Sequence, residues 1–168
     1  VTQSAWLVVC VGCRACNDSL TGLAKRLATT RGVGHLVTTT HHGGGVDARS
    51  TVALSIQGSE FTDNAANASN STYVGGALFL TSTRTADVGN NLFCGNTAYG
   101  GGAVYSYYVY TASDEWTNNI FSDNVATWDG GGGVWFLHHY YLDFINNSLV
   151  GNDANRYGGG IRFSQTYA

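Results

Sequence analysis

Hydrophobic and polar positions recur along this chain with a period near 28 residues. One motif is a glycine pair followed by a small and then an aliphatic residue, at 43–46, 75–78, 101–104, 131–134 and 158–161. A second motif, apolar-x-x-Asn, lies between these copies, at 61–64, 93–96, 121–124 and 149–152. Its asparagines are 32, 28 and 28 residues apart, with an alanine two residues after each and a large apolar residue eight before. Because several independent columns agree, the pattern predicts an internal repeat.

Each repeat lacks a helical period and holds three short apolar runs, which predicts one coil of a parallel β-helix. A sandwich of hairpins is the rival architecture, but it would need alternating turn types and would not explain columns at one coil length. Coils about 4.8 Å apart would align equivalent residues in ladders. We therefore expect an all-β solenoid of about four to five coils, with the glycine pairs at corners that need positive φ.

Alternation within each strand predicts which side chains face the core. The side chains expected inside after each glycine pair are Leu78, Leu80, Val104, Ser106, Val134, Phe136, Ile161 and Phe163. A second inward stack comprises Phe61, Phe93, Phe121 and Leu149. The side chains expected outside are Phe79, Tyr105, Trp135 and Arg162, and the charge of Arg162 favours this register. An amide ladder of Asn91, Asn119 and Asn147 is expected at a bend, where it would satisfy turn backbone.

The two ends depart from the repeat. Residues 1–42 form the predicted N-terminal cap, with a buried strand at 5–11 and a short amphipathic helix within 17–30 that begins at Asp18 or Ser19. The coil domain follows at 43–168. Its fifth coil opens at Gly158 and stops before its apolar-x-x-Asn half. We expect either that more sequence follows or that this edge docks end to end onto itself or another β-helix subunit.

Composition favours an extracellular or cell-surface location. Only 11% of the 168 residues are charged, glycine is frequent at 23, and proline and methionine are absent. Low charge with many uncharged polar and β-branched residues is more typical of a secreted all-β protein than of a cytosolic enzyme. The net charge of −3 offers no basic face for nucleic acid. No apolar run approaches the roughly 18 residues of a membrane helix.

The two motifs resemble the repeat of chlamydial polymorphic outer membrane proteins, which is defined by Gly-Gly-Ala-(Ile/Leu/Val) and Phe-x-x-Asn. The strict forms here are 75–78, 101–104, 61–64, 93–96 and 121–124, and the likeness covers about residues 43–163. Similar repeats occur in secreted proteins of the pectin-lyase-like superfamily. The resemblance implies a right-handed parallel β-helix. It implies little about function, because the motifs mark core and corner positions.

Three acids form the candidate metal site. Asp87, Glu115 and Asp143 each precede the apolar column of Val88, Trp116 and Phe144, so they should stack on one outer face. Like charges about 5 Å apart repel unless a cation bridges them, and Ca²⁺ prefers carboxylate oxygens. The alternative is a solvated acidic ridge with splayed side chains. We expect no other cofactor.

The thiols and histidines have structural interpretations. Cys10, Cys13, Cys16 and Cys94 are disulfide candidates in a secreted chain, although the first three have the spacing that could begin a metal site. The histidine pairs at 41–42 and 138–139 occupy different phases of the coil and are expected at the surface. The glycine run 130–133 lacks the Lys-Ser/Thr of a phosphate-binding loop.

Aromatic residues and sequons mark the candidate contact surface. Phe79, Tyr105 and Trp135, with Tyr108 and Tyr140 nearby, are expected to form an exposed strip that contacts sugar rings or a neighbouring chain. The alternative is that these rings cover strand backbone and lean on each other. Candidate glycosylation sites are Asn67, Asn70, Asn146 and Asn17, of which the first two lie in an insertion at a loop.

These patterns favour a non-enzymatic extracellular β-helix, a rigid shaft in an adhesin or filament. The alternative is a carbohydrate-binding or polysaccharide-degrading protein. Hydrolases need paired carboxylates at a set separation, and no catalytic constellation is visible in the sequence. Asp114 and Glu115 are adjacent, so they should point to opposite faces of a strand.

Overall fold

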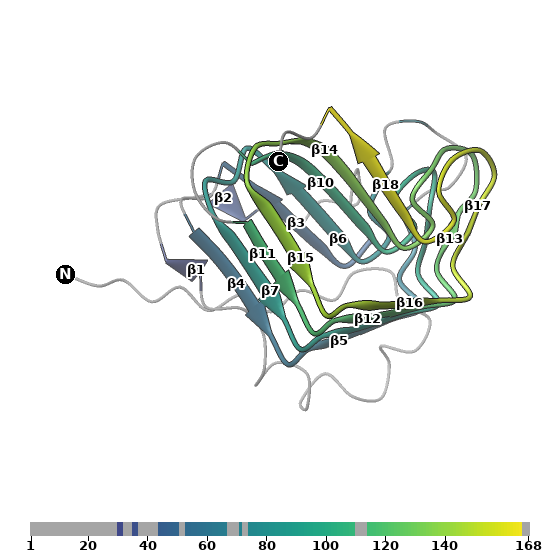
Figure 1. The fold of residues 1–168 in the computed structure, drawn as a ribbon, viewed down its shortest axis with the longest axis horizontal. Helices are drawn as coiled ribbons and strands as arrows, with labels where there is room; N and C mark the ends of the chain where they lie inside the picture. Colours follow the sequence, from purple (N-terminus) through teal and green to yellow (C-terminus); the bar gives the residue numbers. More distant parts are fainter. Residues whose placement is uncertain are drawn as a thin grey trace.

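The repeat folds into a stack of parallel coils, as a computed structural model shows (Figure 1). The structure describes residues 30–31, 35–36, 44–50, 53–66, 71, 74–109 and 114–165. Successive coils add strands to four sheets, which we number in the order in which each coil passes through them after its glycine pair. This arrangement confirms the predicted all-β solenoid, with about four turns.

Sheet 1 comprises β2 (His35–Leu36), β3 (Val46–Arg49), β6 (Leu78–Thr81), β10 (Val104–Val109), β14 (Val134–His139) and β18 (Ile161–Ser164). Sheet 2 comprises β1 (Thr30–Arg31), β4 (Ala53–Gln57), β7 (Ala86–Gly89), β11 (Asp114–Thr117) and β15 (Leu142–Ile145). Sheet 3 comprises β5 (Glu60–Thr62), β8 (Leu92–Cys94), β12 (Ile120–Ser122) and β16 (Ser148–Val150). Sheet 4 comprises β9 (Thr97–Ala98), β13 (Val125–Ala126) and β17 (Asp153–Ala154).

The core consists of side-chain columns that run along the stack. Val104 aligns with Leu78 on one side and Val134 on the other, as predicted, and all three are fully buried. The ring of Phe93 stacks on Phe61 and on Phe121, with centroids 4.9 and 4.8 Å apart. These distances match the spacing between neighbouring strands, so each ring packs on its equivalent in the next coil.

At each corner of a coil, the chain turns at a residue with a left-handed backbone conformation (positive φ). In the four glycine pairs that are fully described, the first glycine has positive φ, as predicted, at Gly75, Gly101, Gly131 and Gly158. The second glycine has a different role. A Cβ on Gly102 would lie 2.2 Å from the carbonyl oxygen of Gly132, so the close stacking of backbones excludes a side chain there.

The other three corners were not predicted to be left-handed. Sheet 1 ends in Ser50, Ser82, Tyr108, His138 and Gln165, sheet 2 in Gly58, Asn90, Asn118 and Asn146, and sheet 3 in Asp63, Gly95, Asp123 and Gly151. Asn and Asp tolerate this conformation better than most residues, whereas Tyr and His adopt it only where the surrounding structure imposes it.

Two asparagine ladders hold the corners that flank sheet 3. In the predicted one, the Asn91 Nδ2 donates to Asn119 Oδ1 at 3.0 Å, and Asn119 donates to Asn147 at 2.9 Å. A second ladder, which was not predicted, links Asn64, Asn96, Asn124 and Asn152. From the second coil onward, each ladder amide also donates to a backbone carbonyl of the preceding coil, so these carbonyls are satisfied at the bends.

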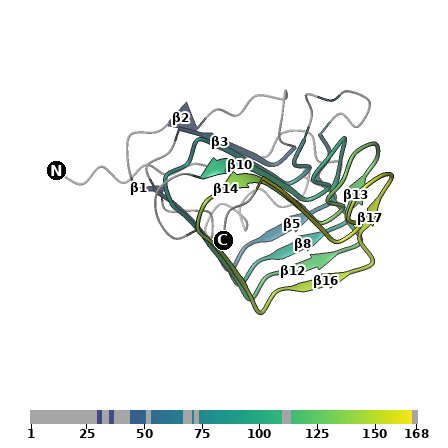
Figure 2. The same cartoon turned by 45° about the horizontal axis from the view of Figure 1, so that its top comes forward.

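The two ends of the stack differ (Figure 2). At the N-terminal end, β1 pairs antiparallel with β4, and β2 pairs antiparallel with β3. These strands cover the first coil's edge in sheets 1 and 2. The predicted cap strand at 5–11 and the predicted cap helix within 17–30 lie outside the described residues, apart from Thr30, which begins β1. At the other end, β15, β16, β17 and β18 are the last strands of their sheets.

Candidate functional site

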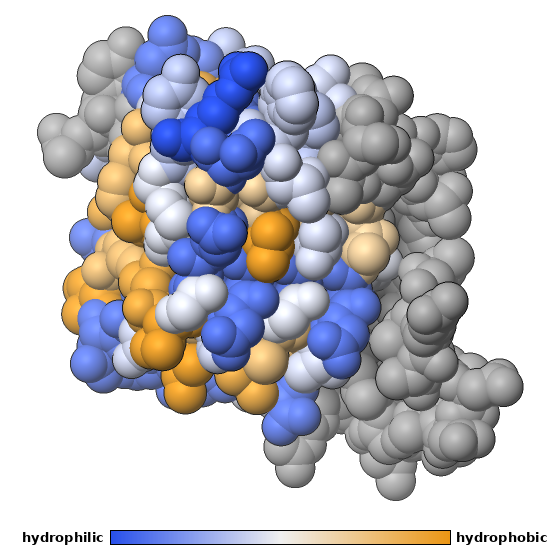
Figure 3. Space-filling model, turned by 90° about the vertical axis from the view of Figure 1, so that its right-hand side faces the viewer, coloured by the Kyte–Doolittle hydropathy of each residue, from blue (hydrophilic) through white to orange (hydrophobic). Residues whose placement is uncertain are grey.

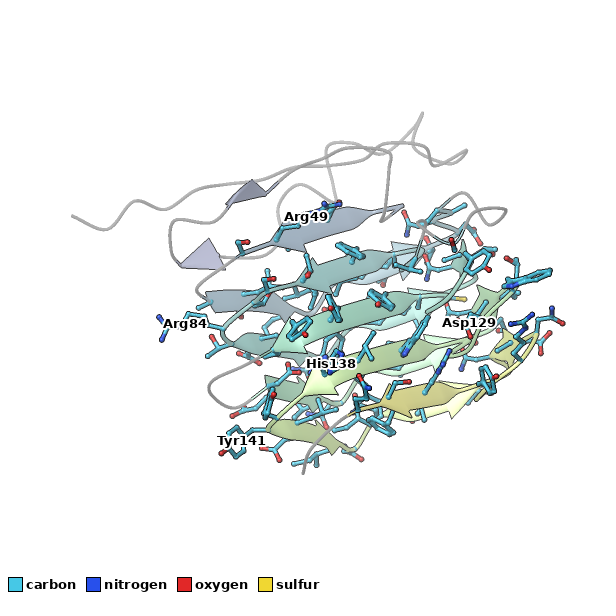
Figure 4. The ribbon with its side chains drawn as sticks, turned by 90° about the horizontal axis from the view of Figure 1, so that it is seen from above. Arg49, Arg84, Asp129, His138 and Tyr141 are labelled. Carbon is cyan, nitrogen blue, oxygen red and sulfur yellow. The ribbon has the colours of Figure 1, made fainter. Side chains whose placement is uncertain are left out.

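The outer face of sheet 1 carries the predicted aromatic column, seen face-on in Figure 4. Phe79, Tyr105 and Trp135 align in register, between Asp47 of β3 and Arg162 of β18. The rings of Phe79 and Tyr105 stack with centroids 5.7 Å apart, and Trp135 meets Tyr105 edge-on at 5.0 Å. The predicted alignment is therefore confirmed.

Arginines cover both ends of this column. The guanidinium of Arg49 lies 5.1 Å from the Phe79 ring and donates twice to the Asp47 carboxylate, at 2.7 Å each. This hydrogen bonding raises the pKa of Arg49 above its ordinary value. Phe79 is only 7% exposed, so its expected exposure was wrong. Its ring packs beneath other groups and presents little contact surface.

Arg162 occupies the other end. Its guanidinium lies 4.1 Å from the Trp135 ring and 4.6 Å from the Tyr157 ring, and it forms an ion pair with Asp129. Trp135 and Tyr105 are half-buried. Burial, followed by the neighbouring Tyr107, raises the pKa of Tyr105 to about 12. A ring face covered by a guanidinium is stabilised by cation–π attraction and is less open to a sugar.

Tyr108 and Tyr140 lie apart from the column. Tyr108 stacks on His138 with centroids 4.7 Å apart, at the left-handed corner that ends sheet 1. Tyr140 is 42% exposed in the connection between β14 and β15. The ring of Tyr107, with its centroid 6.3 Å from Tyr105 and 4.2 Å from Tyr108, connects this corner to the column.

The three predicted acids stack in register on sheet 2. Glu115 lies between Asp87 and Asp143, with Ser55 next to Asp87, and all three acids are exposed. The Asp87 carboxylate accepts a hydrogen bond from Gln57 Nε2 at 2.6 Å. No group of three or more His, Cys, Asp or Glu side chains within the described residues is placed to hold a metal ion. Calcium binding by this column stays a prediction.

A buried polar network joins the third and fourth coils. His139 Nδ1 lies 2.5 Å from Asp114 Oδ2, and the other carboxylate oxygen accepts a hydrogen bond from Trp116 Nε1 at 2.8 Å. His139 Nε2 lies 3.0 Å from the carbonyl oxygen of Ser106. The prediction of surface histidines was therefore wrong for His139, which is fully buried. Asp114 is buried and Glu115 exposed, as predicted.

This network has the residue types of a serine-hydrolase triad but not its geometry. Nε2 faces the backbone carbonyl of Ser106, and the Ser106 Oγ has no hydrogen-bond partner in the part of the chain that the structure describes. All three side chains are sealed from solvent. The imidazole cannot activate the hydroxyl in this arrangement, so its role is structural.

The remaining predicted sites are only partly described. Asn146 is exposed at a corner, and its Nδ2 donates to Asn118 Oδ1 at 2.5 Å. Cys94 is half-buried, and its thiol forms no disulfide within the described residues. The other sequon and cysteine positions lie outside the described residues: Asn17, Asn67, Asn70, Cys10, Cys13 and Cys16.

The edge of the last coil was predicted as a docking surface. Core-column side chains there, Leu142, Phe144 and Leu149, are half-buried, whereas their equivalents Trp116 and Phe121 are fully buried. In Figure 3, hydrophobic residues gather at the left margin, on the side of the last coil. Among the described strands, none pairs with the outer edge of β15, β16 or β17.

Comparison with protein-family models, with curated proteins and with solved structures finds no match. Within the described residues, no helix is long and apolar enough to cross a membrane.

Proposed function

We propose that this chain is a rigid, non-enzymatic shaft segment of an extracellular or cell-surface fibre or adhesin, lengthened when a further β-helix subunit docks on its last coil. One observation supports this most strongly. The core columns run without interruption through the described coils, up to β15, β16 and β17. Each coil contacts only the coils next to it. The same contacts between coils therefore determine both the stiffness and the length of the shaft.

The finer family assignment is part of the proposal. The Gly-Gly-Ala and Phe-x-x-Asn motifs support a relation to the chlamydial repeat and to pectin-lyase-like proteins. The low charge content and the exposed sequon at Asn146 support an extracellular location.

Electron microscopy and light scattering test the docking function. The purified chain should form rods or oligomers that grow with concentration. Leu149→Asp places a charge on the open edge and should abolish growth. Ile120→Asp is the matched control, because Ile120 is 48% exposed on the outward face of sheet 3. A monodisperse monomer at high concentration would contradict the proposal.

Glycan binding is the second candidate. The half-buried Tyr105 and Trp135, and the 47% exposed Trp128, offer aromatic surface. It ranks second because guanidiniums cover Phe79 and Trp135. Titration of acidic and neutral oligosaccharides, monitored by tryptophan fluorescence, would detect binding. Release of unsaturated or reducing ends would identify a lyase or hydrolase instead.

A further inference from the structure

The buried His139–Asp114 pair joins two coils in the interior of the stack. His139 ends β14 in the fourth coil, Asp114 begins β11 in the third, and both side chains are fully buried. The ring of Phe136 meets the imidazole edge-on, with centroids 5.0 Å apart. Because water does not reach the pair, each of its polar atoms depends on a hydrogen bond within the protein.

The two outer contacts of the pair have a fixed direction. Ser106 offers a backbone carbonyl oxygen, which only accepts, so His139 Nε2 at 3.0 Å carries a proton and donates it. Trp116 Nε1 only donates, so Asp114 Oδ1 at 2.8 Å accepts and carries no proton. The one contact left to assign is therefore the one between the two partners.

That contact needs a proton of its own. His139 Nδ1 lies 2.5 Å from Asp114 Oδ2. With no proton between them, a nitrogen lone pair would face a carboxylate oxygen in a dry core, which is repulsive. A proton on either atom turns the contact into a short hydrogen bond and makes the pair neutral overall. The geometry thus requires one proton more than a neutral imidazole beside an ionised carboxylate would hold.

The unfolded chain holds this proton only in acid. A free histidine loses its second ring proton near about pH 6.5, and a free aspartate ionises near about pH 3.9. Above about pH 6.5, folding must therefore take up one proton. Between about pH 4 and 6.5 the folded and unfolded chains hold equal numbers, so no uptake is needed.

We propose that this shared proton is a pH-dependent lock between the third and fourth coils, complete in mildly acidic medium and weakened as the medium becomes alkaline. The lock goes beyond the docking function, because it lies within one chain and needs no partner. Since folding takes up a proton above about pH 6.5, the unfolding equilibrium constant rises up to about tenfold per pH unit there, until the folded pair releases the proton.

The other ionisable groups on the strands around the pair lie on outer faces. They are Tyr105, Tyr107 and Tyr108 on β10, Glu115 on β11, His138 on β14 and Asp143 on β15. Among the described residues, the other buried acid or base is Asp47, which forms an ion pair with Arg49 on β3. Solvent and salt screen the outer groups, and a variant that alters the pair alone leaves their contribution in place.

Asp114→Asn tests the lock, because it keeps the shape and removes the need for the proton. The amide oxygen accepts from Trp116 Nε1, and the amide nitrogen donates to Nδ1 of a neutral His139, so every hydrogen bond is met. The pH dependence should then change sign. Below about pH 6.5 the unfolded variant binds a proton at His139 that the folded variant does not, so acid destabilises it.

Urea denaturation of the whole chain at about pH 5, 6.5 and 8.5 is the measurement. From pH 6.5 to 8.5 the unfolding equilibrium constant should rise about tenfold or more for the native chain and stay within about twofold for Asp114→Asn. From pH 6.5 down to 5 it should rise about tenfold for Asp114→Asn and stay within about twofold for the native chain. His138→Gln, at the half-buried neighbour on the outer face, is the matched control and should follow the native chain.

Parallel pH curves for the native chain and Asp114→Asn would overturn the proposal, because the pair would then take up no proton. If the variant does not fold, nuclear magnetic resonance of the native chain at about pH 8 decides. The proposal expects a slowly exchanging, strongly downfield proton signal that correlates with the His139 ring. A neutral imidazole beside an ionised Asp114, with no such signal, would equally overturn it.

Discussion

The third and fourth coils carry the same motif but bury it to different extents. In the third coil, Trp116, Phe121 and Asn124 are fully buried between two neighbours. Their equivalents in the fourth coil, Phe144, Leu149 and Asn152, are half-buried, because the described chain adds only β18 above them. The motif therefore defines a core position only where coils stack on both sides. Residues at equivalent positions of the repeat therefore contribute different amounts of free energy to folding at different places in the stack.

Truncating the phenylalanine column should give the largest contrast. Phe121→Ala removes a ring packed on Phe93 and closed above by the fourth coil, so it should cost about 4 kcal/mol of unfolding free energy. Leu149→Ala should cost about 1 kcal/mol, because the cavity opens to solvent at the edge. Urea denaturation of both variants checks this. Equal losses would contradict the difference between the coils.

Asp114→Ala should lower the unfolding free energy nearly as much as Phe121→Ala. It leaves His139 Nδ1 and Trp116 Nε1 without their acceptor in a dry core, at a cost of about 3 kcal/mol. Glu115→Ala, one residue away on the exposed face, is the control and should leave stability nearly unchanged. Thermal unfolding distinguishes the two. A small effect of Asp114→Ala would mean that the network contributes little to joining the coils.

The asparagine ladder should show the same contrast on a smaller scale. Asn119→Ala removes the shared acceptor of Asn91 and leaves the buried Val88 carbonyl without its donor, at a cost of about 2 kcal/mol. Asn147→Ala should cost less than about 1 kcal/mol, because water reaches its half-buried site. Chemical denaturation measures both. A larger loss for Asn147→Ala would show that the last ladder position is already sealed.

The repeat made most of the fold predictable, since the glycine pairs and Phe-x-x-Asn motifs recur at one coil length. The strand register, the inward columns and the first ladder followed from that period alone. The left-handed corners at Tyr108 and His138 did not follow, because neither residue favours this conformation and only coil closure imposes it. The backbone conformation of such residues depends on how the coil closes, and the local sequence pattern does not encode this.

The candidate site was harder to predict. The burial of His139 depends on the distant Asp114 and Ser106, which no local spacing connects. The covering of Phe79 and Trp135 depends on Arg49 and Arg162 in neighbouring strands. One signal could have pointed to His139: Ser106 is a small inward residue between the large Leu80 and Phe136 of the neighbouring coils, and it leaves room for a further side chain.

Ionisation of Tyr105 at high pH gives the smallest of the predicted effects on stability. Burial and Tyr107 raise its pKa from 10.0 to about 12, so the folded state favours the neutral phenol. The resulting stability is complete below pH 10 and is lost as pH rises towards 12. Because the ring is only half-buried, we expect a loss of about 1 kcal/mol rather than the full equivalent of the shift.

Unfolding free energies of the native chain and Tyr105→Phe, measured between pH 10 and pH 12, should diverge by this amount. Tyr141→Phe, at a 65% exposed position, is the control and should follow the native chain. Parallel curves for all three proteins would show that the column on sheet 1 is wetter than the covering by Arg162 and Arg49 indicates.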